Sequence, residues 1–110
     1  MFVEEKAAGE AQTAEQKNRK LKLSAAIRIG AKLHPQCEGL LFDGKRSCAL
    51  GAAAIARGWA PQFEGCVRGN PQEEFLGDVY KTDLWREIGS RNDRGQTREE
   101  IADWLETQGY

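Results

Sequence analysis

The sequence predicts a mainly α-helical fold, a compact single-domain bundle of four to five short helices around a central alanine-rich helix. Apolar residues recur at helical spacing from residue 23 onward, and capping residues, glycines and prolines bound these segments. The segment 48–57 is apolar nearly all round, which is typical of a buried helix. A chain of 110 residues has the size of one domain with a modest core.

Composition and charge narrow the class of protein. Apolar residues make up 40% of the chain and charged residues 30%, as in globular proteins. The longest apolar run, CALGAAAIA at 48–56, falls well short of the roughly 18 residues that a membrane helix needs. The start, MFVEEKAAGE, has acids where a secretion signal is apolar, so we expect a cytoplasmic protein with reduced cysteines and no membrane contact.

The chain divides near residue 22. Residues 1–22 carry mostly alanine as their apolar component, so we expect a flexible or frayed helical tail there and a single helical domain over 23–110. The first helix of the domain covers about ten residues of LSAAIRIGAKLHP, with Ser24 as its cap and Pro35 beyond its end. Its core-facing residues are expected to be Leu23, Ile27 and Ala31, with Ile29 and Leu33 beside them.

The central helix follows a tight turn. Asp43-Gly44 is a turn pair, which could close a short β-turn element near residues 40–46. Ser47 occupies the expected N-cap position of a helix over 48–57, and Gly58 the position after its C-cap. The small side chains of this helix would let neighbouring helices approach closely.

Two further helices are predicted after a loop at 59–72. Asn70-Pro71 is a typical helix start, with asparagine as the cap and proline at the first position. The next helix begins at Thr82 or Asp83, turns Ile88 inward, and is expected to stop at Gly89-Ser90. Residues 92–95 are then expected to form a loop held by Asx hydrogen bonds.

The closing segment, NDRGQTREEIADWLETQGY, predicts a well-capped core helix. Thr97 and Glu100 form a capping-box pattern, and Ile101, Trp104 and Leu105 make an apolar stripe. The pattern also resembles the first helix of a helix-turn-helix, but no recognition helix follows in the sequence. Residues 70–110 hold ten acidic and five basic residues, a net charge of −5 that disfavours DNA.

Function is predicted less sharply than fold. We find no catalytic constellation and expect no cofactor, so the leading hypothesis is a non-enzymatic protein that binds another protein. Trp59 and Phe63 lie in the long loop, where exposed aromatics would form a binding patch and buried ones would pack at the edge of the core. The residues assigned to partner binding are Trp59, Phe63, Arg68, Asn92 and Asp93.

Two alternative functions stay open. The basic run at 17–22 could bind nucleic acid through Lys17, Arg19, Lys20 and Lys22, although it lacks aromatics and a solubilising linker is simpler. A zinc-stabilised domain would use the single histidine and all three cysteines, which have the right count but poor spacing. Those candidate ligands are His34, Cys37, Cys48 and Cys66.

Two motifs carry a resemblance to a known group. FDGKRSCALGAA at 42–53 and NDRGQTREEIADWLE at 92–106, with LSAAIRIGAKLHPQ as a looser third, resemble a group of small bacterial and prophage-type proteins. Some members have Cys-x-x-Cys between the two motifs, whereas only Cys66 lies there in this chain. The resemblance implies no particular activity. It implies a mobile-element setting, in which the protein would be a phage or prophage accessory factor, or an inhibitor of a larger host complex.

Overall fold

Five short helices make up the described part of the molecule, residues 20–60 and 71–110 of a computed structural model. Their bounds are α3 (Leu23–Ala31), α4 (Ala49–Ala56), α5 (Pro71–Leu76), α6 (Asp83–Asp93) and α7 (Arg98–Thr107). The predicted mainly α, single-domain fold is confirmed. Of the expected tail at 1–22, only residues 20–22 fall within the described part. None of the described helices is long and apolar enough to cross a membrane.

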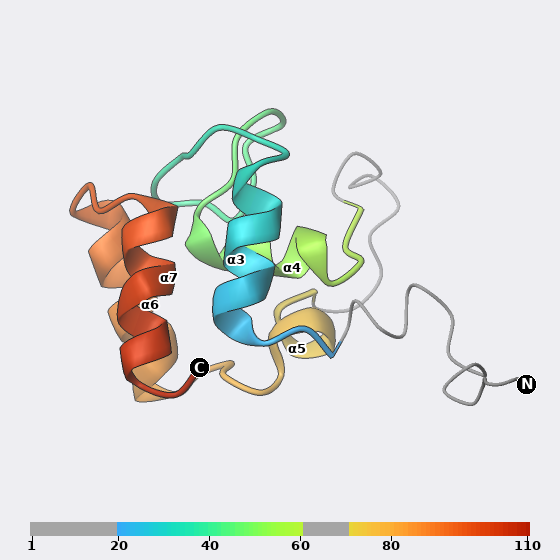
Figure 1. Ribbon diagram of the computed structural model, residues 1–110. Coiled ribbons are helices and arrows are strands. Elements are labelled where there is room, and N and C mark those ends of the chain that lie inside the picture. Colours follow the sequence, from blue (N-terminus) through green and yellow to red (C-terminus); the bar gives the residue numbers. More distant parts are fainter. Residues whose placement is uncertain (1–19, 61–70) are drawn as a thin grey trace, which may run out of the picture.

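Helix α4 lies at the centre of the bundle (Figure 1). Helices α3, α5 and α6 pack against it, and α7 packs against α3 and α6. Helices α3 and α7 run antiparallel, because the backbone N–H of Ser24 donates to the backbone oxygen of Tyr110 at 3.2 Å. Arg28 on α3 also forms ion pairs across to Asp103 (2.6 Å) and Glu106 (3.2 Å) on α7. Part of the negative charge of residues 70–110 is therefore neutralised within the molecule.

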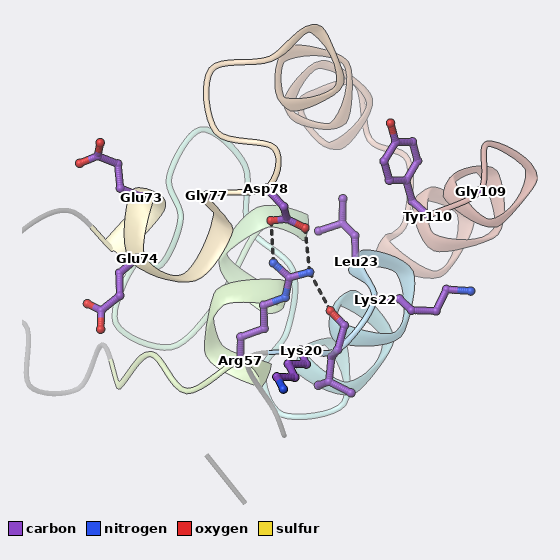
Figure 2. Close-up of a pocket in the computed structure, with 11 residues that line it drawn as sticks. Lys20, Lys22, Leu23, Arg57, Glu73, Glu74, Gly77, Asp78, Gly109 and Tyr110 are labelled. Carbon is purple, nitrogen blue, oxygen red and sulfur yellow. Dashed lines mark hydrogen bonds and ion pairs between the residues drawn. The ribbon is translucent and has the colours of Figure 1, made fainter. Parts of the chain in front are cut away.

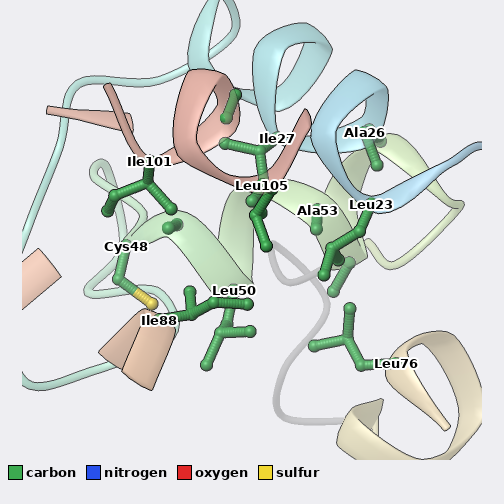
Figure 3. Packing of buried hydrophobic residues seen from close by; sticks show 14 of the residues in the cluster. Leu23, Ala26, Ile27, Cys48, Leu50, Ala53, Leu76, Ile88, Ile101 and Leu105 are labelled. Atoms are coloured by element: carbon green, nitrogen blue, oxygen red, sulfur yellow. The ribbon is translucent and has the colours of Figure 1, made fainter. Parts of the chain in front are cut away.

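The core forms around α4 as predicted (Figure 3). Every residue of α4 except Ile55 is buried. Side chains from all four other helices converge on it: Leu23, Ile27, Leu76, Ile88, Ile101 and Leu105. Each of these six is at most 2% exposed, so on the order of 1.5–3 kcal/mol is gained for each one buried.

Close approach of backbones makes this core possible. A side chain at Gly30 in α3 would place its Cβ 2.0 Å from the backbone oxygen of Ala52 in α4. At Gly51 a Cβ would lie 1.8 Å from the backbone oxygen of Leu41. Neither distance can hold a carbon atom, so only glycine allows α3 and the 39–47 loop to lie this close to α4.

Helix α3 differs from the expectation in its cap and in one of its faces. Ser24 does not cap the helix; it lies inside the first turn and its hydroxyl donates to the Tyr110 backbone oxygen at 2.8 Å. Lys22 is the N-cap residue and provides no side-chain cap. Ile29 and Leu33 are exposed at 43% and 58%, so the expectation that they lie beside the core face was wrong. The core covers the Leu23–Ile27 side only.

The cap of α4 is also different. The residue at the N-cap position is Cys48, whose sulfur accepts a hydrogen bond from the Gly51 N–H at 3.4 Å, so the prediction of Ser47 was wrong by one residue. Ser47 is fully buried and its hydroxyl accepts a hydrogen bond from Arg98 at 3.0 Å. Gly58 follows the C-cap with φ of 121°, as predicted.

Helix α6 begins as predicted but ends later. The Thr82 hydroxyl accepts a hydrogen bond from the Trp85 N–H at 3.2 Å and caps the helix. The helix then continues through Gly89-Ser90 to Asp93, which corrects both the predicted stop and the predicted loop at 92–95. Ile88 and Asn92 explain the extension: they are four residues apart on one buried face, so the added turn reaches the core.

Helix α7 has the predicted capping box, with Glu100 N–H to Thr97 at 3.0 Å and Thr97 N–H to Glu100 at 2.8 Å. Ile101 and Leu105 are fully buried. Trp104 is only partly buried, and the guanidinium of Arg91 covers its ring at 3.9 Å. The expected short β element is present only as two isolated bridges, from Ser47 to Gln36 and from Ser47 to Phe42.

Candidate functional site

An apolar hollow of the described surface lies beside the N-terminal end of α4. This cleft of about 440 Å³ is lined by residues from the 39–42 loop, from α4 and from the end of α6. The predicted site residues Trp59, Asn92 and Asp93 all line it, so the structure brings Trp59 together with a residue pair more than 30 positions later in the sequence. We call it the Trp59 cleft. Its other principal lining residues are Leu40, Leu41, Phe42, Cys48 and Leu50.

Two aromatic rings, those of Phe42 and Trp59, form one wall of the Trp59 cleft. The Phe42 ring makes edge-to-face contacts with Trp59, at 6.4 Å between centroids, and with His34, at 5.1 Å. The Trp59 backbone N–H is bound to the Ala54 oxygen at 2.9 Å, which fixes the residue just beyond the end of α4. Its indole Nε1 is buried without a partner among the described residues. Trp59 is thus partly buried against the edge of the core, as the second of the two expectations has it, while Phe63 lies outside the described residues.

A short loop holds Leu40 at the mouth of the cleft. Leu40 is 59% exposed, as exposed as any large apolar side chain in the described residues. The loop is fixed on both sides: the Cys37 N–H donates to the Ser47 oxygen at 3.0 Å, and the Cys48 N–H donates to the Leu41 oxygen at 3.2 Å. An apolar side chain is thus presented to solvent by an anchored backbone, which lowers the entropy cost of binding.

The turn in this loop is closed by Asp43. Its carboxylate accepts the backbone N–H groups of Arg46 (2.8 Å) and Lys45 (3.2 Å) and also pairs with the Arg46 guanidinium at 2.6 Å. These interactions, the Arg46 backbone hydrogen bond first, hold the pKa of the Asp43 carboxyl below its usual value. The predicted Asp-Gly turn is confirmed, with Gly44 at φ of 102°.

Asn92 is a buried hydrogen-bond hub rather than a loop residue. It is 1% exposed. Its Oδ1 accepts from the Ala49 N–H at 2.9 Å and from the Gln36 side chain at 3.1 Å, and its Nδ2 donates to the Cys37 oxygen at 2.8 Å. One amide therefore joins the end of α6, the start of α4 and the 36–37 strand-like segment. These contacts fix the position of Asn92 beside the cleft. They also leave the Asn92 amide little capacity to bind a ligand.

Asp93 lies next to this hub on the surface. It is the last residue of α6, and its Oδ1 accepts the Gly39 N–H at 2.9 Å. Among the described residues no lysine or arginine pairs with it. Asp93 thus places a carboxylate at the edge of an apolar cleft. This carboxylate lies near Leu40, because it binds the N–H of Gly39, the residue that precedes Leu40.

Three of the four candidate zinc ligands, His34, Cys37 and Cys48, lie within the described residues. No group of three or more metal-binding side chains is found among the described residues, and Cys66 lies outside them. The Cys37 thiol donates to the backbone oxygens of Leu40 and Arg46, both at 3.4 Å. Burial raises the pKa of both the Cys37 and Cys48 thiols, which favours the protonated form over the thiolate that a metal needs.

The basic residues of the nucleic-acid alternative lie elsewhere. Lys17 and Arg19 fall outside the described residues, as does Arg68 of the predicted partner site. Lys20 and Lys22 line a second cleft, of about 600 Å³ (Figure 2). That cleft also carries carboxylates, which repel phosphate. The acidic residues that line it are Glu73, Glu74 and Asp78.

Arg57 forms the floor of this second cleft. The guanidinium is bound to both oxygens of Asp78, at 2.9 and 3.1 Å, and donates to the backbone oxygen of Leu21 at 2.7 Å (Figure 2). It also donates to the backbone oxygen of Phe75 at 2.9 Å. It is 5% exposed. Arg57 therefore ties the end of α4 to α5 and to the segment before α3, which is a structural role.

Sequence reasoning missed two kinds of residue. Leu40 and Phe42 belong to an apolar run that predicts core, and nothing local indicates that Leu40 faces solvent. Arg98 was also missed: it is 6% exposed and donates to the oxygens of Ala31 (3.3 Å), Pro35 (3.3 Å) and Ser47 (3.2 Å). Its pKa is lowered by burial. A single arginine in an amphipathic pattern carries no signal of such a role.

Comparisons of the chain with protein-family models, with curated proteins and with solved structures give no match. The resemblance to small prophage-type proteins therefore stays a prediction. Any functional argument has to start from the Trp59 cleft itself.

Proposed function

We propose that this chain is a small non-enzymatic protein-binding protein whose Trp59 cleft receives an apolar side chain of its partner. The observation that carries the proposal is Leu40, 59% exposed on an anchored loop at the mouth of a cleft walled by Phe42 and Trp59. Binding energy at protein interfaces concentrates where an apolar or aromatic group fills a pocket. A cleft of about 440 Å³ has room for one or two large side chains.

The polar groups of the cleft support binding over catalysis. The Asn92 amide is satisfied by the chain itself, and the Cys48 sulfur caps α4 with its pKa raised by burial. The His34 ring lies against Phe42, and its buried Nδ1 has no hydrogen-bond partner among the described residues. A catalytic site needs a base within hydrogen-bond reach of the group it activates, and the lining residues offer apolar contact instead. We place the protein among accessory factors or inhibitors that act by binding a larger complex.

The test compares two leucines of equal exposure. Leu40 lies at the cleft and is 59% exposed, and Leu33 lies just beyond α3, outside the lining of the cleft, and is 58% exposed. Leu40→Asp and Leu33→Asp variants of the full chain, with wild type, are used to purify bound proteins from cells that naturally contain the protein. The proposal predicts a protein recovered in stoichiometric amount with wild type and Leu33→Asp and lost with Leu40→Asp.

Equal recovery with all three chains, or loss with Leu33→Asp alone, would contradict docking through the cleft. Recovery of nothing above background with wild type would contradict protein binding altogether. Circular dichroism of each variant serves as the control for folding, because both substitutions are at exposed positions and should leave the melting temperature nearly unchanged.

A further inference from the structure

We propose that the segment docked in the Trp59 cleft presents a large apolar side chain directly beside a lysine or an arginine. The inference rests on the proposed function and specifies the chemistry of the partner. Two features of the cleft carry it: the charge at its edge, and the orientation of α6.

The edge of the cleft is negative. Among the described residues that line it, Asp93 is the one with a charge. Its Oδ1 is engaged by the Gly39 N–H at 2.9 Å, so the carboxylate is held in position without being neutralised. Asp93 and Leu40 are brought together by this contact, because Leu40 follows Gly39 in the chain. A residue beside the docked apolar side chain would therefore lie near Asp93.

The arginines of α6 and of its C-cap do not pair with Asp93. Arg86 shares the helix face of position 93 but lies about two turns earlier and pairs with Asp83 at 2.8 Å. At about 100° per residue, positions 87 and 91 lie on the face of α6 opposite to positions 89 and 93. Arg91 pairs with Glu87 at 2.8 Å and covers the Trp104 ring, and Arg94 lies 3.7 Å from the same Glu87 carboxylate. None of these three arginines pairs with Asp93, so the negative charge at the cleft is available to a partner.

The end of α6 adds to this preference. Asp93 is the last residue of an 11-residue helix, whose C-terminal end carries a partial negative charge. A cation beside the cleft would interact favourably with both the helix end and the carboxylate. An acid in the same position would be repelled by both.

A peptide segment suits this geometry better than a free small amine. Small-molecule sites enclose most of their ligand, whereas the Trp59 cleft is open where Leu40 is exposed. A side chain carried by a backbone that continues across Leu40 gains contacts outside the cleft, and the neighbouring residue of that backbone reaches Asp93.

The test uses four capped peptides and the ¹⁵N-labelled full chain. The peptides are acetyl-Gly-Phe-Arg-Gly-amide, its Phe-Glu and Phe-Gln analogues, and a Gly-Arg analogue without the ring. Chemical shifts of the Trp59 indole and of the Gly39 and Asp93 amides report on the cleft. The inference predicts the order Phe-Arg, Phe-Gln, Phe-Glu in affinity, with about a two- to fivefold ratio between the first two, as for an exposed ion pair.

Two variants and a salt series test whether the Asp93 carboxylate causes the preference for arginine. Asp93→Asn keeps an oxygen for the Gly39 N–H and should remove the preference for arginine while leaving the Phe-Gln affinity unchanged. Glu99→Gln removes an exposed acid outside the lining of the cleft and should leave the preference intact. The preference should also shrink as ionic strength rises.

The outcomes separate the two proposals. If the three phenylalanine peptides bind at the cleft with equal affinity, the basic preference is wrong and docking through the cleft stands. If none of the peptides shifts the cleft resonances at millimolar concentration, the docking surface itself is wrong. Tightest binding by the Gly-Arg peptide would also overturn the inference, since it requires the apolar anchor.

Discussion

At the scale of single residues, buried polar side chains decide the connections between elements. Asn92 joins three segments through one amide, and Arg98 satisfies the backbone oxygens around Ser47. The sequence predicts neither role. An asparagine before an aspartate is typical of a loop, and only the position of distant backbone groups, such as the Ala49 N–H, makes it a hub. Local patterns cannot supply that information.

Replacing Asn92 by alanine should destabilise the protein by on the order of 3 kcal/mol, because several buried groups would lose their partner. The exposed Glu38 provides the control, as Glu38→Ala should change stability by less than about 0.5 kcal/mol. Urea unfolding measures both. Similar midpoints for Asn92→Ala and Glu38→Ala would show that the hub contributes little.

The Cys48 thiol should make stability depend on alkaline pH. Its folded-state pKa is raised by burial above the unfolded value, so its contribution is fully present below the ordinary thiol pKa of about 8.5. That contribution is lost as pH rises through the folded-state pKa. The free energy of unfolding, measured by urea between about pH 7.5 and 10, should fall more steeply for wild type than for Cys48→Ser.

Serine is the matched replacement for Cys48 because its oxygen can still cap α4 but does not titrate. Equal slopes for the two chains would mean that Cys48 is not held in an environment that disfavours its thiolate.

At the scale of elements, local signals predicted helices well and their exact ends less well. The capping box at Thr97 and the glycine after α4 were predictable, because both work through neighbouring residues. The extension of α6 past Gly89 was not, because it depends on Asn92 reaching the core. The cap of α4 shifted by one residue because Ser47 is used by Arg98 instead.

The close contact between α3 and α4 gives an element-scale prediction. Gly30→Ala should destabilise by about 1–3 kcal/mol or more, because a Cβ would lie 2.0 Å from the Ala52 oxygen. Gly89→Ala is the matched control inside a helix: apart from the backbone of α6 and the two chain neighbours, no described atom lies within 4 Å of its Cβ. Helix propensity should therefore stabilise by about 0.5–1 kcal/mol. Thermal melting measures both. A tolerated Gly30→Ala would contradict this packing.

The packing at the centre of α4 gives a second prediction at the scale of elements. Ala53 is fully buried, so Ala53→Leu should overpack the core at a cost of about 1–3 kcal/mol. Ile55 is the residue of α4 that is not buried, and Ile55→Leu should be nearly neutral. A higher melting temperature for Ala53→Leu would mean that unfilled space remains beside α4.

At the scale of the whole molecule, the fold class and the core followed from the sequence, while the site followed only in part. Trp59, Asn92 and Asp93 were singled out and do meet at one cleft. Leu40 was missed because an apolar run such as Leu40–Phe42 predicts burial, and its exposure depends on how the loop is anchored to Ser47 and Cys48. Surface hollows arise from tertiary arrangement, which local patterns do not encode.

The central claim, that the Trp59 cleft docks a partner protein, is tested most directly by photo-cross-linking. A photoreactive phenylalanine analogue is placed at position 40 or, as the control, at position 33, and the chains are irradiated in cells that naturally contain the protein. We predict one abundant covalent adduct from position 40 that is absent from position 33. The same adducts from both positions, or none from position 40, would contradict the claim.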